Sequence, residues 1–137
     1  MKTTARNELS GIVVDIKSGG VMSEVLIEVG ENITVCATIT NDSLASLGIA
    51  RRSAVSALIK ASHIVLSKQK LNASARNNIE ASISGITKGA VNSEVRLQVG
   101  GKKLFAVVTN DAIADLGLEP KQSVWAIFKA SSVIVVA

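Results

Sequence analysis

The chain has 137 residues and a formal net charge of +4, and although 47% of its residues are hydrophobic, only 2% are aromatic. A core must therefore be built from Val, Ile, Leu and Ala, and the mild charge, spread evenly over both halves, excludes a basic tail for nucleic acid. The single cysteine, Cys36, excludes an intrachain disulfide and indicates a reducing compartment. The charged N-terminal residues and the short apolar run at 132 to 137 match neither a signal peptide nor a membrane helix, so we expect a soluble cytoplasmic protein without a membrane partner.

Three strands are predicted in the first forty residues. A β-rich segment covers residues 4 to 16 and ends in a glycine-containing turn. Residues 21 to 29 alternate between two faces, one of them mostly apolar, which is typical of a half-buried strand. Gly30 then begins a turn into a third strand over residues 33 to 40.

A short helix is predicted after the third strand, because Thr40 or Asn41 can cap its N-terminus and Gly48 can end it in a left-handed conformation. Two further strands follow over residues 54 to 60 and 62 to 67. Three strands, a helix and two strands, in that order, are typical of a small Greek-key barrel of the OB type.

The same pattern returns in the second half, offset by 70 residues at first and by 69 from Thr40 and Thr109 onward. The repeat predicts an all-β fold of two tandem OB-like five-stranded Greek-key barrels, over residues 1–68 and 71–137, each with one short helix between strands 3 and 4. The linker holds neither Gly nor Pro, so we expect the barrels to pack against each other. The last strands of the second copy are predicted over residues 123 to 129 and 131 to 136.

Apolar side chains are expected on the outer faces of the barrels, chiefly in the second copy. A monomer would expose them, and contiguous apolar surface of more than a few hundred Å² usually marks an interface. We therefore expect a homo-oligomer. The residues are Phe105, Val107, Trp125, Ile127, Ile134 and Val136, with Leu58 and Val65 at equivalent positions of the first copy.

Six polar positions recur in both copies, and they hold two cations, three hydroxyls and one amide. Such a set donates hydrogen bonds, which suits a small oxyanion, whereas a cation site would require carboxylates or thiolates. The structural alternative has hydroxyls at strand ends, arginines paired with Glu24 or Glu94, and lysines on a solvated face. The recurring pairs are Thr4/Ser74, Arg6/Arg76, Asn7/Asn77, Thr40/Thr109, Lys60/Lys129 and Ser62/Ser131.

Four sequence blocks occur in the same order in both copies: T/S-A-R-N, G-A-V-x-S-E-V, V-T-x-x-x-x-x-x-L-G-L and K-A-S. Together they resemble the molybdate- and tungstate-binding Mop domain in its duplicated, di-Mop form. The resemblance covers nearly all of both halves. It implies an OB-like barrel that assembles into a homotrimer and binds molybdate or tungstate between subunits, for intracellular storage and homeostasis.

The resemblance also implies which residues bind the oxyanion. Met22 stands where the family has an asparagine and cannot donate a hydrogen bond, so we expect the two halves to bind unequally. The first type of site is lined by Thr4, Arg6, Asn7, Thr40, Lys60, Ala61 and Ser62, and by Ser74, Arg76, Asn77, Thr109, Lys129, Ala130 and Ser131. The second type of site is formed by two loops, one of Gly19, Gly20, Val21 and Met22, and one of Gly89, Ala90, Val91 and Asn92.

The sequence offers less support for other functions than for oxyanion storage. Catalysis lacks a recurring nucleophile, base or metal-ligand cluster, and the lone His63 aligns with Ser132, so we do not expect an enzyme or a bare metal ion. An OB-type binder of single-stranded nucleic acid requires stacking aromatic residues, which this chain hardly supplies. A regulatory module that senses the anion and acts through a partner protein would use the same donor set.

Overall fold

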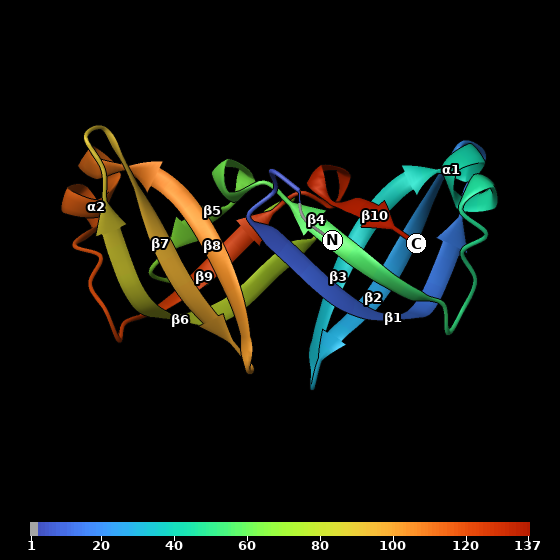
Figure 1. Cartoon of the computed structure of the whole chain (residues 1–137), viewed down its shortest axis with the longest axis horizontal. Coiled ribbons are helices and arrows are strands. Elements are labelled where there is room, and N and C mark those ends of the chain that lie inside the picture. Colours follow the sequence, from blue (N-terminus) through green and yellow to red (C-terminus); the bar gives the residue numbers. More distant parts are fainter. Residues whose placement is uncertain (1–2) are drawn as a thin grey trace.

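The computed structural model describes residues 3–137 as two curled, five-stranded antiparallel sheets that lie side by side (Figure 1). This arrangement confirms the predicted all-β fold of two barrel-like units with few short helices. The first half contains β1 (Asn7–Ser18), β2 (Met22–Gly30), β3 (Ile33–Thr40), α1 (Asn41–Ser46), β4 (Ala54–Ile59), the 3-10 turn η1 (Ala61–His63) and β5 (Val65–Ser67). The second half contains β6 (Asn77–Lys88), β7 (Asn92–Val99), β8 (Lys102–Thr109), α2 (Asn110–Leu116), β9 (Ser123–Phe128), the 3-10 turn η2 (Ala130–Ser132) and β10 (Ile134–Val136).

The two helices lie at the far ends of the molecule and begin and end as the sequence predicts (Figure 1). The N-caps are Thr40 and Thr109, whose hydroxyl oxygens accept hydrogen bonds of 3.0 and 3.1 Å from the backbone N–H three residues on. Gly48 and Gly117 follow the helices with φ of +64° and +63°, a conformation that glycine adopts at little cost. Within the described part of the chain, no helix has the length and apolar character needed to cross a bilayer.

Each sheet takes one strand from the other half of the chain. β10 pairs with β4 in the sheet of the first half, and β5 pairs with β9 in the sheet of the second half, so the two short strands cross over near the centre of the molecule (Figure 1). The sequence predicted five strands per barrel but not this exchange. Residues 62 to 63 and 131 to 132, predicted as the starts of strands, belong to the 3-10 turns η1 and η2, which lead into the exchanged strands.

The long strands β1 and β6 are the central strands of the two sheets. β1 pairs with β4 through its first part and with β2 through its second, and a bulge lies between Val13 and Asp15. β6 has a bulge at the equivalent place, between Ile83 and Gly85. A bulge bends a strand and increases its twist, so one strand can serve two neighbours around a curved sheet. The enclosed core is aliphatic apart from Phe128, as the composition predicts.

Two buried asparagines, which we term the Asn clamps, join the halves. Asn7 accepts a hydrogen bond from Phe105 N (2.6 Å) and donates to Phe105 O (2.8 Å) and Ile59 O (3.0 Å). Asn77 accepts from Cys36 N and donates to Cys36 O, both at 2.8 Å. An amide side chain carries a donor and an acceptor, so each clamp satisfies main-chain groups of the strand from the other half. The clamps therefore fix the two barrels against each other.

The outer faces are less exposed than the sequence predicted. Val65 and Ile134 are each 59% exposed, but Leu58 and Ile127 are buried, so the prediction was wrong for these two. The reason is the strand exchange, since Ile134 pairs directly with Leu58 and Val65 with Ile127. Of the other residues expected there, the following are half-buried: Phe105, Val107, Trp125 and Val136.

Candidate functional site

Five of the residues predicted to bind an oxyanion in the second copy border one small pocket, which we term the Arg76 pocket. Its volume is about 190 Å³. Ligand sites for drug-sized molecules exceed about 300 Å³, so this space suits a small ion. Two cations and three hydroxyl groups surround it. The lining residues are Thr38, Ser74, Ala75, Arg76, Lys129, Ala130 and Ser131.

The 3-10 turn η2 sets the position of Lys129 and Ser131 in this pocket. Lys129 precedes the turn with an extended backbone (φ −75°, ψ 142°). Ala130 is buried, and its small side chain lets the turn pack closely against β3 of the other half. Lys129 and Ser131, on either side, stay exposed and free to contact a ligand. The sequence K-A-S thus combines an anchor with two flanking donors.

We term the equivalent residues of the first copy the Arg6 cluster. Lys60 again precedes a 3-10 turn with an extended backbone (φ −65°, ψ 133°), and Ala61 is again buried. The turn η1 packs against β8, the strand equivalent to β3. Each donor set therefore faces a strand of the opposite half. The members of the Arg6 cluster are Thr4, Ala5, Arg6, Lys60, Ala61 and Ser62.

Each arginine is paired with a glutamate across the two halves, as the structural alternative supposed. Arg6 donates to both carboxylate oxygens of Glu94 through Nε and Nη2, each at 2.9 Å, and its guanidinium lies 4.2 Å from the centre of the Phe105 ring. These hydrogen bonds hold the pKa of Glu94 below its ordinary value, and Glu94 in turn raises the pKa of Arg6. Arg76 donates to Glu24 through Nη1 at 2.5 Å.

Both ion pairs are open to solvent on the arginine side. The side chains of Arg6 and Arg76 are 52% and 54% exposed. A solvated pair of this kind contributes little to stability and is readily exchanged for another anionic partner. The pairing is therefore compatible with oxyanion binding, because an incoming dianion competes with one carboxylate for each guanidinium group.

Four residues of the predicted first site type are engaged elsewhere. Asn7 and Asn77 are 1% and 2% exposed and use their amide groups in the Asn clamps, so we assign them to joining the halves. Thr40 and Thr109 cap α1 and α2, and neither borders the Arg76 pocket. The strand that faces η2 is β3, so a threonine near the Arg76 pocket comes from the first copy and not from the second.

The loops predicted as a second site type connect β1 to β2 and β6 to β7. Asn41 and Asn110 tie these loops to the helices, donating to Gly19 O and Gly89 O, both at 2.9 Å. The loop tips carry exposed apolar side chains, with Val21 at 72% and Val91 at 70% exposure. The geometry holds the loop backbone firmly and leaves the tips free to meet another molecule.

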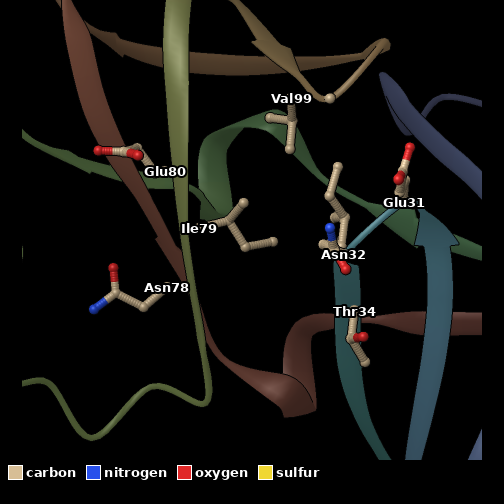
Figure 2. A pocket seen from close by; sticks show the side chains of 9 residues that line it. Glu31, Asn32, Thr34, Asn78, Ile79, Glu80 and Val99 are labelled. Carbon is tan, nitrogen blue, oxygen red and sulfur yellow. The ribbon is translucent and has the colours of Figure 1, made fainter.

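A different hollow lies between the halves, with a volume of about 480 Å³. Figure 2 shows Ile79 directed towards Asn32, while the side chains of Asn78 and Glu80 point to the other side of β6. Its described lining includes the two acids Glu31 and Glu80 and no Lys or Arg. An oxyanion would be repelled there, so size does not make this hollow the functional site.

Sequence reasoning missed two lining residues, Ala75 and Thr38, of which only Thr38 carries a hydroxyl group. Its equivalent in the second copy is Val107, so a search for polar residues common to both copies passes over it. Its Cα partner across the β2–β3 hairpin is Glu24, the acid paired with Arg76. The place of Thr38 beside the donors of the other half follows only from the packing of β3 against η2.

The fold and the pocket define a protein of two β-barrel units that exchange strands, with a small basic pocket where η2 meets the other half. The model of the TOBE domain matches residues 3–66 and 73–135, and the chain belongs to this family.

Similar proteins share this duplicated architecture. A solved structure of the cytoplasmic molybdate-binding protein ModG with molybdate bound is 38% identical and superposes with a TM-score of 0.95, covering 100% of this chain and 99% of that one. The molybdenum transport protein ModE of Azotobacter vinelandii is 39% identical over 98% of this chain and 51% of its own length. The molybdenum-pterin-binding protein MopA of Rhodobacter capsulatus is 36% identical over 98% of this chain and 52% of its own length. The chain thus spans about half the length of these two curated relatives.

Proposed function

We propose that the protein binds molybdate, or the closely similar tungstate, for storage and homeostasis in the cytoplasm, and that it is not an enzyme. The observation that carries the proposal is the Arg76 pocket, where two cations and three hydroxyls converge on a space of about 190 Å³. Charge-assisted donors to a dianion give hydrogen bonds roughly twice as strong as neutral ones. The likeness over the full length to molybdate-bound ModG supports the choice of ligand.

The role of each group follows from its chemistry. Arg76 and Lys129 neutralise the two negative charges, and the hydroxyls of Ser74 and Ser131 orient the oxygens. Ala130 can offer only its main-chain N–H. The Arg6 cluster supplies the same groups from the first copy, and the loops Gly19 to Met22 and Gly89 to Asn92 form secondary sites.

A homotrimer is part of this proposal. One pocket holds only two cations for a desolvated dianion, and a neighbouring subunit would add further donors. Apolar residues suited to a subunit contact remain exposed on the exchanged strands, at Val65 and Ile134. Light scattering after size exclusion should give three times the chain mass, and a monomer at every concentration would contradict this part.

A second candidate function is that of an anion-sensing module that acts through a partner protein, because similar sequence makes up about half of the longer molybdenum transport proteins named ModE. Storage and sensing differ in the exchange of the ion. Slow release of bound molybdate on dilution supports storage, whereas rapid release supports sensing through a partner protein.

Binding is tested by calorimetric titration of the purified protein with molybdate, tungstate and sulfate, together with metal analysis after dialysis. Replacing Arg76 or Lys129 with Ala should weaken molybdate binding by about tenfold or more, because a charge-assisted hydrogen bond is lost. The matched control is Lys88→Ala, which removes an exposed lysine outside the pocket. Unchanged affinity and stoichiometry in both pocket variants would contradict the proposal.

A further inference from the structure

The two donor clusters have the same K-A-S turn and the same arginine but face different strands. Thr38 lies beside η2 in the Arg76 pocket, and its equivalent on β8, the strand that packs against η1, is Val107. The two residues are equivalent in register, since Thr38 is the Cα partner of Glu24 and Val107 is the partner of Glu94. A hydroxyl group in one cluster is therefore replaced by a methyl group in the other.

The arginines also differ in how firmly they are held. Within the described residues, Arg6 makes two hydrogen bonds to Glu94 and stacks over Phe105, whereas Arg76 makes one hydrogen bond to Glu24. The residue equivalent to Phe105 is Cys36, which has no aromatic face. An oxyanion that binds Arg6 must compete with a bidentate carboxylate and a ring, and one that binds Arg76 with a single contact.

We propose that the two clusters bind oxyanions unequally, that the Arg76 pocket fills first, and that Thr38 is a specificity-determining residue of that pocket. The inference rests on the proposed function and adds to it a residue of the opposite half. Thr38 donates a hydrogen bond to an oxygen of the bound ion. Val107 has the same shape but no donor, so an oxygen facing it loses its hydrogen bond to water without replacement.

The exchange of strands makes this residue part of the pocket. Since η2 packs against β3, a change in the first copy alters binding by the donors of the second copy. The difference between Thr38 on β3 and Val107 on β8 therefore gives one chain two affinities for the ion, while both copies keep the same arginine, lysine and serine donors. A store of this kind takes up the ion at low concentration in one set of pockets and gains capacity from the other set.

The experiment exchanges the two facing residues in the full-length protein. Wild-type protein titrated with molybdate should show two classes of pocket. Thr38→Val should weaken the tighter class by about tenfold, as expected for a lost hydrogen bond to a charged group. Thr38→Ser keeps the hydroxyl and should stay within about twofold of wild type. Val107→Thr should strengthen the weaker class, which a misfolded variant cannot do.

Crystals of wild-type protein grown with less than one molybdate per chain assign the classes, because molybdenum scatters anomalously. Anomalous density at Arg76 before Arg6 is the expected result, and equal density at both would overturn the inference. Unchanged binding in both Thr38→Val and Val107→Thr would also overturn it. If the wild-type protein binds no molybdate, the proposed function itself fails, so the two failures are distinguishable.

Discussion

The two halves of the chain use the same clamp but different strands beside their donors. Asn7 binds the backbone of Phe105, and Asn77 binds the backbone of Cys36 at the equivalent position. Two residues further along, Val107 stands on one strand and Thr38 on the other. The backbone groups that the clamps bind are common to all residues, so these side chains were free to diverge. After the duplication, the arrangement of the two barrels thus stayed the same, while the side chains of the strands that face the two clusters changed.

The clamps are where the two halves should respond most strongly to substitution. Asn7→Ala leaves the part-buried N–H of Phe105 and the carbonyls of Phe105 and Ile59 without this partner, and should lower the free energy of unfolding by about 3 kcal/mol. Asn77→Ala removes two such bonds and should cost about 2 kcal/mol. Urea unfolding followed by circular dichroism measures both losses.

The exposed Asn92 offers a matched control for these substitutions. Asn92→Ala removes an exposed side-chain amide at the start of β7 and should leave the urea midpoint within the error of wild type. If Asn7→Ala were as stable as Asn92→Ala, the hydrogen bonds of Asn7 would not stabilise the contact between the two halves.

The sequence predicted the local features of this fold well, because their causes are local. Thr40 caps its helix and Gly48 takes a left-handed conformation, as their side chains dictate. The exchange of β5 and β10 was not predicted, since alternation fixes which face of a strand is buried and not which of two near-identical neighbours it joins.

The sequence predicted only part of the candidate site, because the site also depends on which strand faces each donor set. The arginines, lysines and serines recur in both copies, and the structure places those of the second copy around one pocket. Asn77 recurs because it joins the halves, so recurrence alone could not separate a ligand donor from a clamp. Thr38 does not recur, and its part in the pocket follows only from the strand that faces η2.

The ion pair of Arg6 also distinguishes the two halves, through the pH dependence of the protein's stability. The pKa of Glu94 is lowered in the folded chain by its hydrogen bonds with Arg6, so the ionised carboxylate stabilises the fold above the ordinary value of 4.5. This contribution is lost as the pH falls through the folded-state pKa. Glu94→Gln should therefore destabilise the protein modestly at neutral pH, by much less than Asn7→Ala, and reduce the loss of stability on acidification.

Urea midpoints measured from neutral pH to below 4.5 test this expectation. At neutral pH, Glu24→Gln is the matched substitution in the other half and breaks one hydrogen bond with Arg76, so it should cost less than Glu94→Gln. Equal acid sensitivity of wild type and Glu94→Gln would show that the bidentate pair does not distinguish the two arginines.

The smallest expected effect concerns the ring beneath Arg6. Phe105→Leu keeps an apolar side chain on β8 but removes the aromatic face that lies 4.2 Å from the guanidinium. Arg6 then leaves Glu94 more readily, and the affinity of the Arg6 cluster for molybdate should rise by on the order of twofold, since an exposed cation–π contact is weak. Cys36→Ala, the matched change on β3, should leave the Arg76 pocket unaltered. Weaker binding by Phe105→Leu, measured by calorimetry, would mean that the ring orients Arg6 for the ion instead of restraining it.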